Sequence, residues 1–374
     1  MNDRECISGL IDLSHQYGDS IDWIQGAGGN TSVKLTSGIA IKQSGFRFRD
    51  LSVTTGHVTV SLDRAAIMEL YQKKGTPVEN EAAYNALMQK ICEGISGRPS
   101  IELSFHCFGR TLTVHTHPTF INVFTCSQEG LSKLSETQFK GASLKAVEYA
   151  KPGIELTFNI IQRFNLEADT LLPPVTLLGN HGLIVTADSA ADVMRLTEQL
   201  EQLLAEIAGL SMVSDEWNER ELKENTKLSQ QLSDALQSSK QILAMDQAIL
   251  HQIQKEQLVG ELVNNGIVYP DAAVYAGKSI LIIDDDSPEN VKENVESFIQ
   301  SNGHLPKVCL YNGTFYAIAA GQKEAAYIQE MFCDHLKVLY YIRKLNWTPQ
   351  FLNSGQLDDL LNWDAEKHRQ KMAQ

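Results

Sequence analysis

A short turn in the middle of the chain, Gly179-Asn180-His181-Gly182, most constrains the possible folds. It stands between two apolar runs, Leu177-Leu178 and Leu183-Ile184-Val185. Glycine and asparagine adopt the backbone conformations that tight turns need, and short apolar runs bounded by such residues are typical of strands. The pattern therefore predicts a hairpin, or a tight strand-loop-strand, with the two strands side by side.

Other segments of the first 212 residues add strands and helices around this turn. Alternating apolar residues or short apolar runs predict strands, and capping residues in front of helical patterns predict helices. Strands are expected at 32–35, 38–43, 57–62 and 111–117. Helices are expected at 5–16 and 63–74, from Pro99-Ser100 onward, and from Asp188-Ser189 onward. This mixture predicts an α/β domain over residues 1–212.

The rest of the chain divides into two further regions. Residues 213–264 are predicted to form a helical linker or cap, because Glu, Lys, Gln and Leu dominate and proline is absent. Residues 265–374 combine a strand near 278–283, a helix at 287–300, a hairpin at Asn312-Gly313 and a long helix at 323–344. A smaller C-terminal α/β domain is therefore expected, and 374 residues are enough for two domains.

Composition narrows the classes of partner. A net charge of −14 argues against nucleic acid, because such a surface repels phosphate backbones. Six scattered cysteines in a chain this long are expected to be reduced and mostly buried thiols. The first residues carry charge and lack a long apolar segment, and no apolar run is long enough to span a bilayer. A cytoplasmic protein without membrane contact is expected.

The strongest chemical signal is the segment His115-Thr116-His117. If residues 111–117 form a strand, His115 and His117 lie on one face, roughly 6–7 Å apart along the backbone. Two imidazoles at that spacing can share a metal ion. The same pair also fits surface or catalytic histidines that bind no metal.

His181 and Glu102 extend this signal. His181 lies in the predicted turn, where its ring can approach a neighbouring strand, and three histidines with an open position are typical of catalytic zinc. Glu102 is the candidate carboxylate, since it lies four residues before His106 in the predicted helix. The alternatives are a turn histidine with a local hydrogen bond and an ordinary glutamate at a helix N-terminus.

Small residues in three places could bind an anion. One group forms a glycine-rich nest, another follows a predicted strand, and a serine begins a predicted helix. These candidates are Gly28, Gly29, Asn30, Ser44, Gly45 and Ser100. Each feature by itself is more often only a turn or a helix cap.

Together these segments resemble the class II aldolase/adducin family. GAGGNTSVKL at 26–35, PSIE at 99–102, HTH at 115–117 and GNHGL at 179–183 occur in this order in that family. The chain looks most like the aldolase portion of bacterial rhamnulose-phosphate aldolase/alcohol dehydrogenase fusion proteins, without their dehydrogenase domain. The resemblance is strong over residues 20–210 and looser after them.

The resemblance implies an α/β/α sandwich with a mostly antiparallel central sheet. It implies that Zn²⁺ or another divalent metal is bound by His115, His117 and His181, with Glu102 as the general acid/base. The phosphate of a small sugar phosphate would be held by Asn30, Ser44, Gly45 and Ser100 with the Gly28-Gly29 turn. It also implies a homo-oligomer, with a tetramer as one option. The chain departs from the family at Ile101, where many members carry a second serine.

The function implied is a zinc-dependent aldehyde-lyase of carbohydrate metabolism. It would cleave a ketose phosphate similar to rhamnulose 1-phosphate by retro-aldol chemistry, with zinc stabilising the enediolate. Two alternatives remain open. One is a sugar-phosphate epimerase or dehydratase that uses the same site, and the other is a non-catalytic, adducin-like interaction protein.

Overall fold

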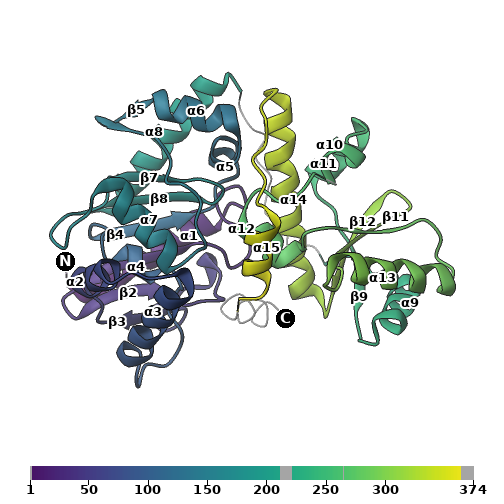
Figure 1. The fold of residues 1–374 in the computed structure, drawn as a ribbon, viewed down its shortest axis with the longest axis horizontal. Helices are drawn as coiled ribbons and strands as arrows, with labels where there is room; N and C mark the ends of the chain where they lie inside the picture. Colours follow the sequence, from purple (N-terminus) through teal and green to yellow (C-terminus); the bar gives the residue numbers. More distant parts are fainter. Residues whose placement is uncertain (1, 211–220, 264, 364–374) are drawn as a thin grey trace. The chain divides into compact units, whose positions relative to one another are not determined.

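The computed structural model describes residues 2–210, 221–263 and 265–363 (Figure 1). Its packing divides the chain into a first unit, Met1–Val213, and a second unit, Ser214–Gln374. The first unit ends one residue after the predicted boundary at 212. Among the described residues, no helix is both long and apolar enough to cross a membrane.

The first unit is built on a six-stranded sheet with the order β3-β2-β1-β4-β8-β7. Every neighbouring pair of strands in it is antiparallel, which confirms the predicted central sheet. The strands are β1 (Asn30–Leu35), β2 (Gly38–Lys42), β3 (His57–Val60), β4 (Leu112–Thr116), β7 (Val175–Leu178) and β8 (Gly182–Ala187).

Helices cover both faces of this sheet, as expected for an α/β/α sandwich. One face packs Ile41 and Ile184 into an apolar core with α2 (Arg64–Gln72), α3 (Pro77–Ile91), α4 (Leu103–His106) and α7 (Ile154–Phe164). The opposite face contacts α1 (Asp3–Gly18), α5 (Thr119–Thr125) and α8 (Ala190–Ala208). The remaining elements are η1 (Phe48–Asp50), α6 (Gln128–Glu136), β5 (Gln138–Phe139) and β6 (Ala142–Ser143).

The predicted hairpin is confirmed, because Leu178 of β7 pairs with Gly182 of β8. Asn180 adopts a left-handed conformation with φ of 53°, which asparagine tolerates better than most residues. Two predicted helix starts are also confirmed. The Asp63 side chain accepts from the Ala66 N–H at 2.9 Å, and the Ser189 side chain accepts from the Asp192 N–H at 3.1 Å.

The helix predicted to begin at Pro99-Ser100 is shorter than expected. Pro99 forms a β-bridge with Gln43, and the Ser100 N–H donates to the Lys42 carbonyl at 3.1 Å. These pairings use the segment as an extension of the sheet, so α4 begins only at Leu103. Glu102 therefore lies just before the helix instead of in its first turn.

The second unit has a four-stranded sheet with the order β10-β11-β12-β9, in which only β10 and β11 are parallel. Helices α9 and α13 pack their apolar residues on it. The strands are β9 (Gln241–Ala244), β10 (Leu281–Ile283), β11 (Val308–Tyr311) and β12 (Thr314–Ala319). The helices are α9 (Thr226–Leu236), α10 (Ala248–Lys255), α11 (Val259–Val263), α12 (Pro270–Ala276), α13 (Pro288–Asn302), α14 (Gln322–Lys344) and α15 (Ser354–Leu361).

The predicted helical linker at 213–264 contains a strand, which corrects that prediction. Gln237 adopts a left-handed conformation with φ of 50° and ends α9, and β9 then pairs with β12, placing Ile242 opposite Ile318. Residues 211–220 of this region lie outside the described residues. Elsewhere, the predicted hairpin at Asn312-Gly313 is confirmed. Five of the six cysteines are buried, as expected for mostly buried thiols.

Candidate metal centre

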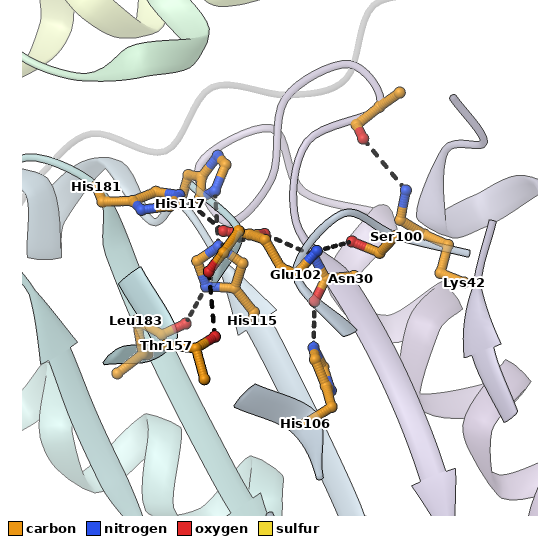
Figure 2. A network of polar contacts seen from close by, with 12 residues as sticks. Asn30, Lys42, Ser100, Glu102, His106, His115, His117, Thr157, His181 and Leu183 are labelled. Carbon is orange, nitrogen blue, oxygen red and sulfur yellow. Dashed lines mark hydrogen bonds and ion pairs between the residues drawn. The ribbon is translucent and has the colours of Figure 1, made fainter. Parts of the chain in front are cut away.

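Three histidines meet at one end of the first unit's sheet (Figure 2). His115 belongs to β4, His117 follows its end, and His181 lies in the β7–β8 turn. Because β4 pairs with β8, with His115 opposite Ile184, the turn that precedes β8 lies beside the end of β4. One nitrogen of each ring lies within 4.8 Å of the others, and all three side chains are buried.

The spacing of the rings fits a single metal ion. Their centroids are 4.8, 4.9 and 5.0 Å apart, and the Nε2 atoms of His115 and His117 are separated by 3.0 Å. Two nitrogens bound tetrahedrally to one Zn²⁺ at about 2.0–2.1 Å would lie about 3.3 Å apart. Three imidazoles are also the donor set of many catalytic zinc sites, in which a fourth position stays open. These histidines can therefore hold a divalent metal.

The backbone of β8 orients the first of these rings. Nδ1 of His115 lies 2.9 Å from the carbonyl oxygen of Leu183, which can only accept a hydrogen bond. Nδ1 therefore carries the proton, and the lone pair of neutral His115 is on Nε2, which faces the cluster. Gly182 permits this close packing, since a Cβ there would lie 2.3 Å from the Thr116 carbonyl oxygen.

The carboxylate of Glu102 faces the three histidines, as Figure 2 shows. Its Oε2 atom is 3.4 Å from His115 Nε2, and its Oε1 atom is 3.5 Å from His181 Nε2. Oε2 also accepts a hydrogen bond from Nδ2 of Asn30 at 2.8 Å. Within the described residues Oε1 makes no hydrogen bond. One carboxylate oxygen is thus fixed by the protein, while the other is available at the cluster.

The three loops predicted to bind phosphate are joined to one another. The Ser100 N–H donates to the Lys42 carbonyl at 3.1 Å. The buried Lys42 ammonium group donates to the carbonyl oxygens of Ala27 at 3.2 Å and Phe46 at 2.6 Å. One lysine therefore connects the glycine-rich loop with the Ser44-Gly45 turn, and its backbone connects both with the segment before Glu102.

Several of the predicted phosphate donors have partners inside the protein. The Gly28 N–H donates to the backbone carbonyl oxygen of Gln25 at 3.0 Å, and the Ser44 N–H donates to that of Arg98 at 2.9 Å. Gly29 has φ of +56°, and a Cβ there would lie 2.4 Å from the His115 carbonyl oxygen. Glycine is therefore needed at this position for the approach to β4, whatever the loop binds. Phosphate binding by this set stays a prediction.

His106 makes hydrogen bonds near the site that the sequence did not indicate. The sequence pattern places it only as a neighbour of Glu102 on a helix face, yet its two ring nitrogens bond Asn30 and Ser32. Burial lowers the pKa of His106 well below its usual 6.5, and His115 and Lys34 act in the same direction. The alternation of Asn30 and Ser32 along a strand is the available signal, but the predicted strand begins only at residue 32.

Comparisons with known proteins found several similar solved structures. Similar solved structures include the N-terminal class II aldolase domain of a conserved protein from Thermoplasma acidophilum, with 17% identity, TM-score 0.41, and coverage of 54% of this chain and 92% of that chain. YgbL from Klebsiella pneumoniae, a putative aldolase/epimerase/decarboxylase, has 19% identity and TM-score 0.38 with 56% and 92% covered. L-fuculose-1-phosphate aldolase from Thermus thermophilus has 14% identity and TM-score 0.35 with 56% and 98% covered.

No curated protein matches the chain. The model of the class II aldolase and adducin N-terminal domain family, in contrast, matches residues 9–207, which is more than half of the 374 residues. That range contains the whole six-stranded sheet, the three histidines and Glu102. This chain therefore belongs to the class II aldolase and adducin N-terminal domain family.

Proposed function

We propose that this protein is a metal-dependent aldehyde-lyase that cleaves a ketose phosphate, with rhamnulose 1-phosphate as the first candidate substrate. The observation that carries the proposal is the Glu102 carboxylate held within 3.5 Å of two of the three clustered histidines. A carboxylate beside a three-histidine site supplies a proton-transfer group next to a place for a Lewis acid. Membership of the aldolase family supports the same assignment.

His115, His117 and His181 would hold Zn²⁺ or another divalent ion, which when bound polarises a substrate carbonyl as a Lewis acid. The chain's own contribution is to fix the geometry of that site. Leu183 holds the ring of His115 through its carbonyl oxygen, and the other two rings come from the strand end and the hairpin turn. Because the rings are buried, little rearrangement is needed when substrate arrives.

Glu102 is assigned the proton transfer at carbon. In the cleavage direction the hydroxyl group beside the breaking bond gives its proton to water, and the carbon that bears it leaves as an aldehyde. The electron pair of the broken carbon–carbon bond remains on a carbon of the phosphate-bearing fragment. Protonated Glu102 then gives its proton to that carbon, and in the reverse direction the carboxylate removes it. Oε1 is the oxygen assigned to this step, because Oε2 accepts the hydrogen bond from Asn30.

The substrate phosphate is assigned to the three joined loops beside this site. With the Gly28 and Ser44 N–H groups bonded internally, the hydroxyl groups of Ser44 and Ser100 are the side-chain donors assigned to it. Holding the phosphate at a fixed distance from Glu102 would place the reacting carbon near Oε1, which lowers the entropic part of the barrier.

The test compares wild type, His115→Ala and Glu102→Gln. Elemental analysis should find a bound divalent metal in wild type and Glu102→Gln, and none in His115→Ala. With rhamnulose 1-phosphate, wild type should release an aldehyde and dihydroxyacetone phosphate. Glu102→Gln should lower kcat by about 10²–10⁴-fold, the usual contribution of a general acid/base.

Two outcomes would overturn the proposal. One is wild-type protein that neither contains nor takes up Zn²⁺, Co²⁺ or Mn²⁺, which would favour the interaction-protein alternative. The other is metal-loaded protein that releases no aldehyde from rhamnulose 1-phosphate or fuculose 1-phosphate. Conversion of a ketose phosphate to its epimer without aldehyde release would replace the lyase assignment with an epimerase.

A further inference from the structure

We propose that His106 is a positioning residue that holds Asn30, and through it the Glu102 carboxylate, in place beside the three histidines. The path runs through hydrogen bonds from Ser32 to His106, between His106 and Asn30, and from Asn30 to Glu102 (Figure 2). The inference rests on the proposed proton-transfer role of Glu102. It gives the Asn30 side chain a role different from the predicted contact with phosphate.

The chemistry of the end groups fixes the direction of every hydrogen bond in this path. An ionised carboxylate only accepts, so Asn30 must present its Nδ2 amide group to Glu102, at 2.8 Å. The Oδ1 atom of Asn30 then faces His106, and it also only accepts, so Nε2 of His106 carries a proton. In a neutral ring Nδ1 is then an acceptor, and the Ser32 hydroxyl donates to it at 2.7 Å.

Regular backbone places these side chains. Asn30 and Ser32 are two residues apart on β1, so both point to the same face of the sheet. Asn30 lies opposite His115 in the neighbouring strand β4, which puts its amide group beside the metal ligands. His106 is the last residue of α4 on that face, and its ring bridges the two strand residues. Sites on such rigid elements hold their geometry better than sites on loops.

Burial keeps the path in one arrangement. His106 has no exposed surface, Asn30 and Ser32 are 2% exposed, and Glu102 is 5% exposed. A buried polar group that loses its partner cannot replace it with water, so each reversed hydrogen bond would cost free energy. Neutral His106 with its proton on Nε2 is the arrangement that leaves every hydrogen bond of the path satisfied.

The path has a direct consequence for the reaction. Both oxygens of Glu102 face the cluster, with Oε2 3.4 Å from His115 Nε2 and Oε1 3.5 Å from His181 Nε2. Asn30 holds Oε2, and this leaves Oε1 as the oxygen without a hydrogen bond among the described residues. Without His106 the amide group of Asn30 can rotate, and the carboxylate loses its fixed orientation. Proton transfer at carbon should then slow while substrate binding changes little. A side chain that only fills space would lower stability without separating kcat from KM.

The first experiment needs no substrate. Protein labelled with ¹⁵N-histidine is studied by NMR at pH 7, and the His106 signals are assigned by their loss in His106→Phe. The expected result is a neutral ring with its proton on Nε2, exchanging slowly with water. A proton on Nδ1, or a doubly protonated ring, would overturn the proposed path whether or not the protein cleaves sugar phosphates.

The second experiment measures kinetics with rhamnulose 1-phosphate. His106→Phe fills the space without a donor, whereas His106→Gln can present an amide N–H near the position of Nε2. We expect His106→Phe to lower kcat by about 10–100-fold, as for other residues that orient a catalytic ligand. KM and metal content should stay near wild type, and His106→Gln should recover most of kcat.

A double-mutant comparison completes the test, since an effect that acts through Glu102 disappears when Glu102 is already changed. His106→Phe should add little to the loss caused by Glu102→Gln. Two results would show a structural role and contradict the proposal. One is that His106→Phe lowers kcat by the same factor in Glu102→Gln as in wild type. The other is that His106→Gln does not regain kcat. If wild type cleaves no ketose phosphate, the proposed function fails, and the NMR result still decides the path.

Discussion

The two units of the chain each contain a buried histidine, and these two differ in the hydrogen-bond partners of their ring nitrogens. In the first unit, His106 has a hydrogen-bond partner on each ring nitrogen. In the second unit, His335 of α14 is 5% exposed, and its Nε2 atom has no hydrogen-bond partner among the described residues. A buried ring with defined partners has one orientation and can serve a site. The ring of His335 has the Gly266 backbone as a partner instead, and burial lowers its pKa, as it lowers that of His106.

The two confirmed hairpins repeat this contrast. Asn180 and Asn312 both adopt the left-handed conformation, with φ of 53° and 48°, although the first loop has three residues between paired positions and the second has two. Only the turn of the first unit is followed by a histidine, and β4 lies beside it to supply two more. The backbone of a turn is thus set locally, but a site requires the neighbouring strand as well.

The largest difference between the units should appear in metal binding. Wild type and His335→Ala should both bind Zn²⁺, whereas His115→Ala should not, because among the described residues only the first unit places three imidazoles within 4.8 Å. A hundredfold excess of Zn²⁺ over its Kd should stabilise the first two proteins by about 2.7 kcal/mol. Thermal unfolding with and without Zn²⁺ measures this. Zinc stabilisation that survives in His115→Ala would break the comparison.

A smaller difference is expected between the losses of stability caused by two glycine substitutions. Gly29 and Gly313 both have positive φ, 56° and 75°, so alanine costs about 1–2 kcal/mol of backbone strain at either site. At Gly29 the added Cβ would also lie 2.4 Å from the His115 carbonyl oxygen, whereas at Gly313 nothing lies within 4 Å. Gly29→Ala should therefore lower the midpoint of urea unfolding more than Gly313→Ala. Equal shifts would show that the loop moves away from β4 without cost.

A third difference concerns the dependence of stability on pH. Burial lowers the pKa of His335 from 6.5 to about 4, while the Gly266 backbone acts in the opposite direction. Because the unfolded chain binds this proton more tightly, stability is fully present above pH 6.5 and is lost as the pH falls toward 4. The slope from this one group is at most about 1.4 kcal/mol per pH unit.

His335→Phe should flatten that slope between pH 6.5 and 4. Urea unfolding of wild type and variant at pH 7 and pH 4.5 measures the difference. The same slope in wild type and His335→Phe would mean that this ring is already satisfied when protonated.

The features best predicted from the sequence are those that depend on residues close together in the chain. The turn at Asn180 and the caps at Asp63 and Ser189 were all found, because turn and cap chemistry is local. The three histidines were also brought together as predicted. Strand β9 was missed because its pairing with β12 lies about 75 residues away in the chain, and a short Ile-Leu pair fits a helix as well.

The contacts around Glu102 could not be derived in the same way. Asn30 bonds Glu102 only because α4 and β1 pack on one another, and spacing along the chain carries no information about that packing. Ser100 was assigned to a helix N-terminus, but the extended segment around it is paired with β2 instead. The histidines could therefore be predicted from local sequence patterns. The residues that surround them depend on tertiary pairing and could not.

The order of strands in the first sheet has a consequence for biosynthesis. Asn30 is made early, Glu102 and His115 follow, and His181 comes 151 residues after Asn30. A growing chain on the ribosome therefore exposes the His115-Thr116-His117 pair well before the third histidine exists. Until the β7–β8 turn has emerged and paired with β4, any ion captured there has at most two imidazole ligands. If the three histidines hold a metal as proposed, its retention would mark a first unit whose synthesis and folding have both passed the hairpin.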